Sequence, residues 1–165
     1  MAEKTLTDLF EDSLKDIYFA ERKILATLPK MVKAAESSDL KAAFETHRTQ
    51  TEGHVQRLEE VFGIIDQKPK GKTCPAILGI LEEGSDLMEE YAGSPALDAA
   101  LISAAQAVEH YEITRYGTLK RWAETLGYTE AVQLLDETLQ EEGQTDKDLT
   151  ELAETEAKAM AQAAE

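Results

Sequence analysis

Glu109-His110-Tyr111-Glu112 lies inside a long run, residues 96–126, whose apolar residues recur every three or four positions. This spacing predicts one amphipathic helix. Two carboxylates three positions apart share a face of such a helix, and the pattern places Glu112 on the apolar face and Glu109 at its edge. A buried carboxylate is costly unless a cation or hydrogen bonds stabilise it. Unless the apolar face is assigned wrongly, the stretch therefore predicts a metal site or a buried polar network.

The remaining sequence is typical of an all-α protein that forms a single domain over residues 1–165. Capping signals include Thr5 with Asp8, Ser94 followed by Pro95, and Thr129. Glycine at 127 is suited to a left-handed helix end. Together with the apolar periodicity, these signals predict five helices, at about residues 5–36, 39–65, 75–91, 95–126 and 130–158.

The connections between the predicted helices determine the topology. Very short turns join the first long helix to the second and the third long helix to the fourth, so each pair forms an antiparallel hairpin. About 30 residues separate the two hairpins and hold the short helix, which is long enough to cross the bundle lengthwise. The sequence thus predicts an up-down-down-up four-helix bundle with a short extra helix in its crossover.

Charge and cysteine content exclude several classes of protein. The formal net charge of -16 argues against binding to nucleic acid or to an anionic membrane. The single cysteine, Cys74, excludes an intrachain disulfide and a structural thiolate zinc site. Neither an apolar leader nor an apolar run long enough to span a membrane is present, so we expect a cytoplasmic protein.

Every long helix carries an acidic or imidazole side chain on its apolar face near the middle of its length. These side chains are Glu21, His54, Glu109, Glu112 and Glu142. Because their depths from the helix starts are similar, antiparallel packing would bring them to one level of the bundle. Carboxylate and imidazole ligands without sulfur suit iron, manganese or zinc.

This pattern resembles the ferritin-like di-iron carboxylate superfamily, and most closely its rubrerythrin-type bundles. Over nearly its full length the chain also resembles the YciF-like bacterial family of ferritin-like stress proteins. The segments that carry this resemblance are residues 16–21, 50–55, 101–112, 116–119 and 137–146. The resemblance implies a ferritin-like bundle, a homodimer and a part in the stress response, but no assigned reaction.

The chain departs from the rubrerythrin pattern, which has Glu-x-x-His on the second and fourth helices. Here those helices carry Thr51-x-x-His54 and Glu142-x-x-Thr145. His47 is expected to donate to a backbone or Asp group rather than to bind metal, and His110 is also left out of the site. The candidate metal ligands are Glu21, His54, Glu109, Glu112, Glu142 and, as a substitute, Asp146. A single metal ion, a weak dinuclear site and a metal-free polar core all stay open.

Three functions follow from these alternatives. The first is an iron protein, with manganese or zinc as other metals, that has oxidase or peroxide-scavenging chemistry. It would need an external electron donor because the chain has no rubredoxin-type cysteines. The second is a non-enzymatic dimeric stress or structural protein with a vestigial polar core. The third is a helical adaptor that binds a partner through an exposed apolar face. The sequence does not decide whether a reaction is catalysed.

Overall fold

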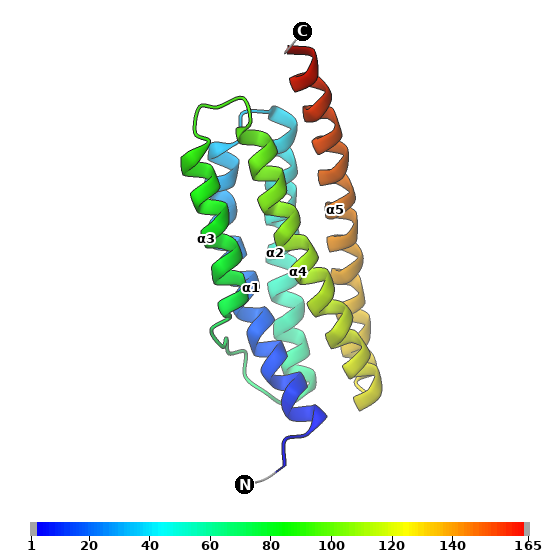
Figure 1. Cartoon of the computed structure of the whole chain (residues 1–165). Helices are drawn as coiled ribbons and strands as arrows, with labels where there is room; N and C mark the ends of the chain where they lie inside the picture. The colour runs from blue at the N-terminus through cyan, green and yellow to red at the C-terminus, as the bar shows by residue number, and fades with distance from the viewer. Residues whose placement is uncertain (1–2, 164–165) are drawn as a thin grey trace.

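The computed structural model describes residues 3–163, which form five helices and no strand. Four long helices make up the bundle: α1 (Leu6–Ala34), α2 (Ser38–Ile64), α4 (Leu97–Leu126) and α5 (Thr129–Ala163). The shorter α3 (Pro75–Glu90) packs on the outside against α1 and α4 (Figure 1). The all-α prediction is therefore confirmed.

The order of helix directions is also as predicted. In Figure 1, α1 runs upward from the N-terminus, α2 and α4 both run downward, and α5 runs upward again. The crossover returns the chain to the upper end through α3, so α2 and α4 can be parallel. This up-down-down-up arrangement is that of a ferritin-like four-helix bundle.

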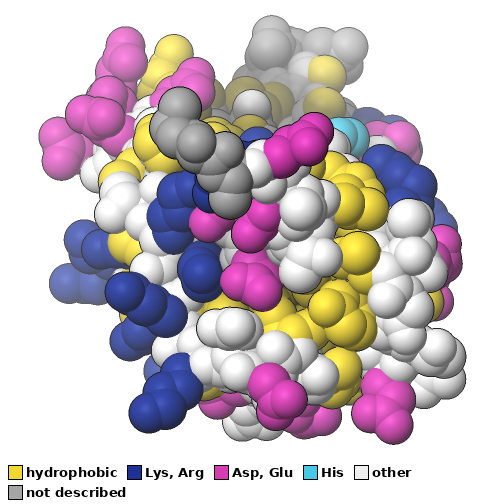
Figure 2. All heavy atoms as spheres, turned by 90° about the horizontal axis from the view of Figure 1, so that it is seen from below, with side chains coloured by type: hydrophobic (Ala, Val, Ile, Leu, Met, Phe, Trp, Pro, Cys, Tyr) yellow, Lys and Arg dark blue, Asp and Glu magenta, His cyan; other side chains and the backbone are white. Residues whose placement is uncertain are grey.

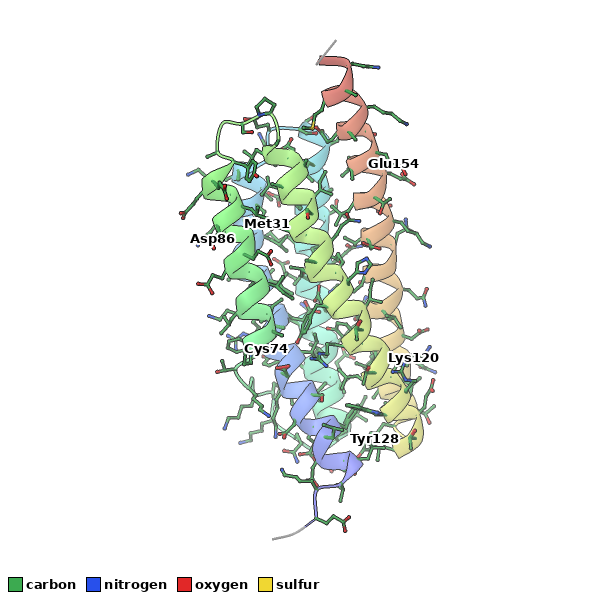
Figure 3. The ribbon with its side chains drawn as sticks, in the orientation of Figure 1. Met31, Cys74, Asp86, Lys120, Tyr128 and Glu154 are labelled. Carbon is green, nitrogen blue, oxygen red and sulfur yellow. The ribbon has the colours of Figure 1, made fainter. Side chains whose placement is uncertain are left out.

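Two of the predicted helix ends are formed as expected. Thr5 and Asp8 make a capping box at the start of α1: the Asp8 N–H donates to Thr5 Oγ1 at 3.2 Å, and the Thr5 N–H donates to Asp8 Oδ2 at 2.8 Å. Gly127 ends α4 with a φ of 80°, a left-handed conformation that favours glycine. Cys74, labelled in Figure 3, caps α3 by accepting from the Ile77 N–H at 3.4 Å.

Other predicted helix ends were wrong. Ser94 does not cap α4, because its Oγ accepts from the Ala96 N–H at 3.1 Å and closes a separate turn. The helix begins only at Leu97, so Pro95 lies outside its first turn. Thr129 is the first residue of α5 rather than its cap, and α5 continues beyond the predicted end at residue 158 to Ala163.

A contact between distant segments fixes the upper end of the bundle. Asp98, in the first turn of α4, is buried and accepts from the N–H groups of Glu36 and Ser37 at 2.8 and 2.7 Å. It thereby ties α4 to the turn between α1 and α2. At the lower end, Tyr128 (Figure 3) packs on Phe10 with ring centroids 5.7 Å apart.

The surface carries charges of both signs. Figure 2 views the end of the bundle at which the N-terminus lies, where many Lys and Arg side chains gather on the left, others lie at the upper right, and acidic side chains are spread over the face. Across the chain, 33 acidic residues outnumber 17 basic ones. Within the described residues, none of the helices combines the length and the apolar character that crossing a bilayer requires.

Candidate metal centre

Six side chains from all four long helices meet inside the bundle. They are Glu21 on α1, His47 and His54 on α2, Glu109 and Glu112 on α4, and Glu142 on α5. All six are at most 5% exposed. Each helix contributes them from the apolar face that packs the core, so the folding of the bundle itself brings them together.

The six residues form two overlapping groups of four potential ligands. One group is Glu21, His54, Glu112 and Glu142, and the other is His47, Glu109, Glu112 and Glu142. In each group the ligand atoms lie within 4.8 Å of one another. Glu112 and Glu142 belong to both groups, whereas each group has one further glutamate and one histidine of its own. The two groups therefore lie side by side and share two carboxylates.

The cluster contains the unsatisfied polar atoms of the core. Nine buried side-chain nitrogen or oxygen atoms lack a hydrogen-bond partner among the described residues, and all nine belong to these six side chains. The Nε2 atom of His47 is one of them, although it lies 3.0 Å from Glu109 Oε1. Each unsatisfied buried group costs about 1–3 kcal/mol. Cations held between these atoms would remove that cost, so the donor set fits a pair of metal ions.

Electrostatics strengthens this interpretation. Four carboxylates carry four negative charges, which two divalent cations would balance. Burial raises the pKa of Glu112 well above its usual value, and the negative charges of Glu142 and Glu21 raise it further. Burial likewise raises the pKa of Glu109, and the negative charge of Glu142 raises it further. A protein without bound cations would therefore hold protons at these carboxyl groups.

His54 lies beside two buried carboxylates, those of Glu21 and Glu142. Burial by itself lowers the pKa of His54, but the carboxylates of Glu21 and Glu142 overcome this effect and raise it to about 11. Its Nδ1 atom lies 3.0 Å from Glu142 Oε1 and 3.3 Å from Glu21 Oε1. Nδ1 thus faces the cluster and would be the atom that binds a metal.

The other ring nitrogen of His54 faces away from the cluster. Nε2 lies 2.8 Å from Glu141 Oε2, and Arg57 donates to both oxygens of Glu141 at 2.8 and 2.9 Å. Arg57 also pairs with Glu137 at 2.7 Å. A carboxylate on the outer nitrogen orients a metal-binding histidine and increases its basicity. A second hydrogen bond orients another cluster residue, because Tyr116 donates its hydroxyl proton to Glu21 Oε1.

The structure brings together five of the six candidate ligands from the sequence. Asp146 is not among them: its Oδ1 accepts from Gln106 at 3.2 Å and lies 3.0 Å from His110 Nε2. The Asp146 side chain is 21% exposed, and that of His110 is 69% exposed. Asp146 therefore faces the outer edge of the contact between α4 and α5, and His110 lies outside the cluster as expected.

His47 is the residue that sequence reasoning missed. We expected it to donate to a backbone or Asp group, but it lies in the second group beside Glu109. The sequence did contain a signal for a second imidazole ligand: His47 precedes His54 by seven residues, which is two helical turns on one face. Thr51, which stands where a rubrerythrin-type glutamate would be, donates to the His47 carbonyl at 2.8 Å. The second imidazole thus comes from α2 instead of α5.

Comparison with known proteins finds a matching family model, a relative of similar sequence and solved structures of similar fold. Residues 5–162 match a family model described as a domain of unknown function, DUF892. Protein YciF of Escherichia coli (strain K12) is 43% identical over 151 residues, which is 91% of each chain. The crystal structure of the E. coli stress protein YciF has a TM-score of 0.90 and 41% identity, over 94% of this chain and 99% of that chain.

Two further solved structures share the fold. YcfI from Rhodopseudomonas palustris, for which a structural role has been suggested, has a TM-score of 0.87 and 44% identity, over 89% of this chain and 94% of that chain. A protein from Xanthomonas campestris pv. campestris has a TM-score of 0.74 over 96% of this chain and 97% of that chain. The latter is only 19% identical, so it supports the fold alone.

Proposed function

The chain belongs to the DUF892 family, and we propose that it binds two transition-metal ions, with iron as the first candidate, in the buried cluster. The observation that carries the proposal is the set of nine buried polar atoms without a hydrogen-bond partner, which lie on six residues arranged as two groups of four that share two residues. Buried polar atoms without a partner are rare in folded proteins. Their confinement to one carboxylate and imidazole cluster is what a metal centre would produce.

The ligand assignment follows from the two groups. Glu21 and His54 would bind one ion, and His47 and Glu109 the other. Glu112 and Glu142 belong to both groups and would be available as ligands to either ion. Oxygen and imidazole nitrogen ligands without sulfur suit iron, with manganese and zinc as alternatives.

Several residues would prepare the site for redox chemistry. Iron, when bound, would supply the capacity to reduce dioxygen or peroxide. Tyr116 holds Glu21 by a hydrogen bond, and Arg57 with Glu141 holds the His54 ring. The burial of all six cluster residues limits their contact with bulk water. Turnover would require electrons from another protein, since the one cysteine of the chain is a helix cap.

The cellular role is proposed from the relatives. The E. coli relative is named a stress protein, which supports a part in the stress response for this chain. The cytoplasmic location and the homodimer stay proposals from the sequence and its family resemblance. The suggested structural role of the R. palustris relative favours a second candidate, a dimeric structural protein whose polar core holds no metal. That candidate leaves most of the buried polar atoms of the cluster without hydrogen-bond partners, so we rank it second.

Metal analysis distinguishes the two candidates. Protein purified without chelator, or reloaded anaerobically with Fe(II), should retain about two metal ions per chain, one for each group. Glu112→Ala removes a carboxylate that both groups share and should abolish stable loading of both positions. His110→Ala, which changes an exposed histidine on the same helix, is the control and should retain both ions. A wild-type protein that retains no iron, manganese or zinc would favour the structural candidate.

A further inference from the structure

A cavity of about 130 Å³ lies next to the cluster, and all five helices contribute to its lining. Its inner end is formed by His47 and Glu109, two of the proposed metal ligands. Leu28, Met31 and Phe44 are among the side chains of its apolar walls. Met31, labelled in Figure 3, lies in the upper half of the bundle. The cavity thus extends from the cluster toward the end of the bundle at which α1 terminates.

The mouth of the cavity lies between α2 and α5. Thr46 and Asp148 are exposed there, and Gln50 and Thr145 are half-buried behind them. Thr145 Oγ1 donates to Gln50 Oε1 at 3.3 Å, so these two polar groups contact each other across the opening. Asp148 disfavours an anion at the mouth, and the apolar walls disfavour any charged molecule farther inside.

We propose that this cavity binds one small neutral apolar molecule, about the size of benzene, with its inner end against His47 and Glu109. A dry cavity of about 150 Å³ lined by Leu, Ile and Phe is known to bind benzene or xenon. The present cavity has a similar volume and also has Ile, Leu and Phe in its walls, but it carries polar groups at both ends, is open to solvent and touches the cluster. The position of the ligand beside a metal ion rests on the proposed function. Occupancy of the cavity itself depends only on its apolar walls.

The test is a benzene titration followed by NMR chemical shifts and by the unfolding temperature. Ala43→Leu places a larger side chain on the cavity lining and should weaken benzene binding at least tenfold. Ala42→Leu makes the same change at the exposed neighbouring position on α2 and should leave binding unchanged. Ala105→Leu fills the cavity from α4 and serves if Ala43→Leu does not fold. Equal benzene binding by wild type and a folded filling variant would overturn the proposal.

Two further measurements separate this proposal from the metal proposal. If the protein bound xenon but not benzene, the cavity would admit only gases. This result would also overturn the benzene proposal. With Co(II) in the cluster, benzene should change the visible absorption of the wild type and of Ala42→Leu, but not of Ala43→Leu. Benzene binding by protein that retains no metal would support the cavity and refute the metal site. Metal loading without benzene binding would support the metal site and refute the cavity proposal.

Discussion

His47 Nε2 lies 3.0 Å from Oε1 of Glu109, and both side chains are buried. This pair completes the second group of potential ligands, which has the same composition as the group of Glu21 and His54. Each half of the cluster then has one histidine, one glutamate of its own and a share in Glu112 and Glu142. The equivalence of the two halves is the main structural argument for two metal ions instead of one.

The first prediction concerns His47. His47→Ala should lower the metal content from about two ions to about one per chain, because the group that contains His54 keeps its four ligands. Metal analysis after dialysis against metal-free buffer measures this change. His110→Ala should keep both ions, since His110 is outside the cluster. Full metal content in His47→Ala would show that His47 is not a ligand.

The second prediction concerns Arg57, which reaches the cluster only through Glu141 and His54. Arg57→Gln should weaken metal binding by up to about 10-fold, the lower end of the effect of losing an outer partner of a ligand, because Arg57 contacts Glu141 and not His54 itself. Arg48→Gln, which alters a more exposed arginine on α2, is the matched control. Competition with a chromophoric chelator measures both affinities. Identical affinities in the two variants would exclude an orienting role for the ion pair between Arg57 and Glu141.

The third prediction concerns Asp98 and separates stability from metal binding. Asp98→Ala leaves the N–H groups of Glu36 and Ser37 without their acceptor and should lower the free energy of unfolding by about 1–3 kcal/mol. Metal content should stay unchanged, because Asp98 lies at the upper end of α4. Asp86→Ala, an exposed position on α3, should have little effect. Urea denaturation of all three proteins checks the difference.

The fourth prediction is a pH dependence at the start of α1. Hydrogen bonds from Thr5 lower the pKa of Asp8 below its ordinary value of 3.8. Because the pKa is lower in the folded state, the ionised carboxylate stabilises the fold above pH 3.8, and this contribution is lost as the pH falls through the folded-state pKa. Asp8→Asn should therefore be less stable than wild type at pH 7, with the difference shrinking toward pH 3. A difference that stays constant with pH would contradict the assignment.

The sequence predicted most of the fold because the apolar periodicity is long and the turns within each hairpin are short. The five ligand candidates that meet in the structure were found for a related reason: a charged side chain on an apolar helical face demands a partner. His47 was missed because a buried histidine can be neutral, so its position alone indicates no metal. Ser94 was misassigned because it hydrogen-bonds to Ala96 in a separate turn. Asp146 lies outside the cluster because it hydrogen-bonds to Gln106 on α4, a contact between helices that the sequence pattern does not predict.

The most direct test is anomalous X-ray scattering from crystals soaked anaerobically with Fe(II), recorded above and below the iron absorption edge. We predict two peaks inside the bundle, one beside Glu21 and His54 and the other beside His47 and Glu109, with Glu112 and Glu142 between them. A map with no peak at these side chains, or with iron only at surface carboxylates, would contradict the dinuclear site.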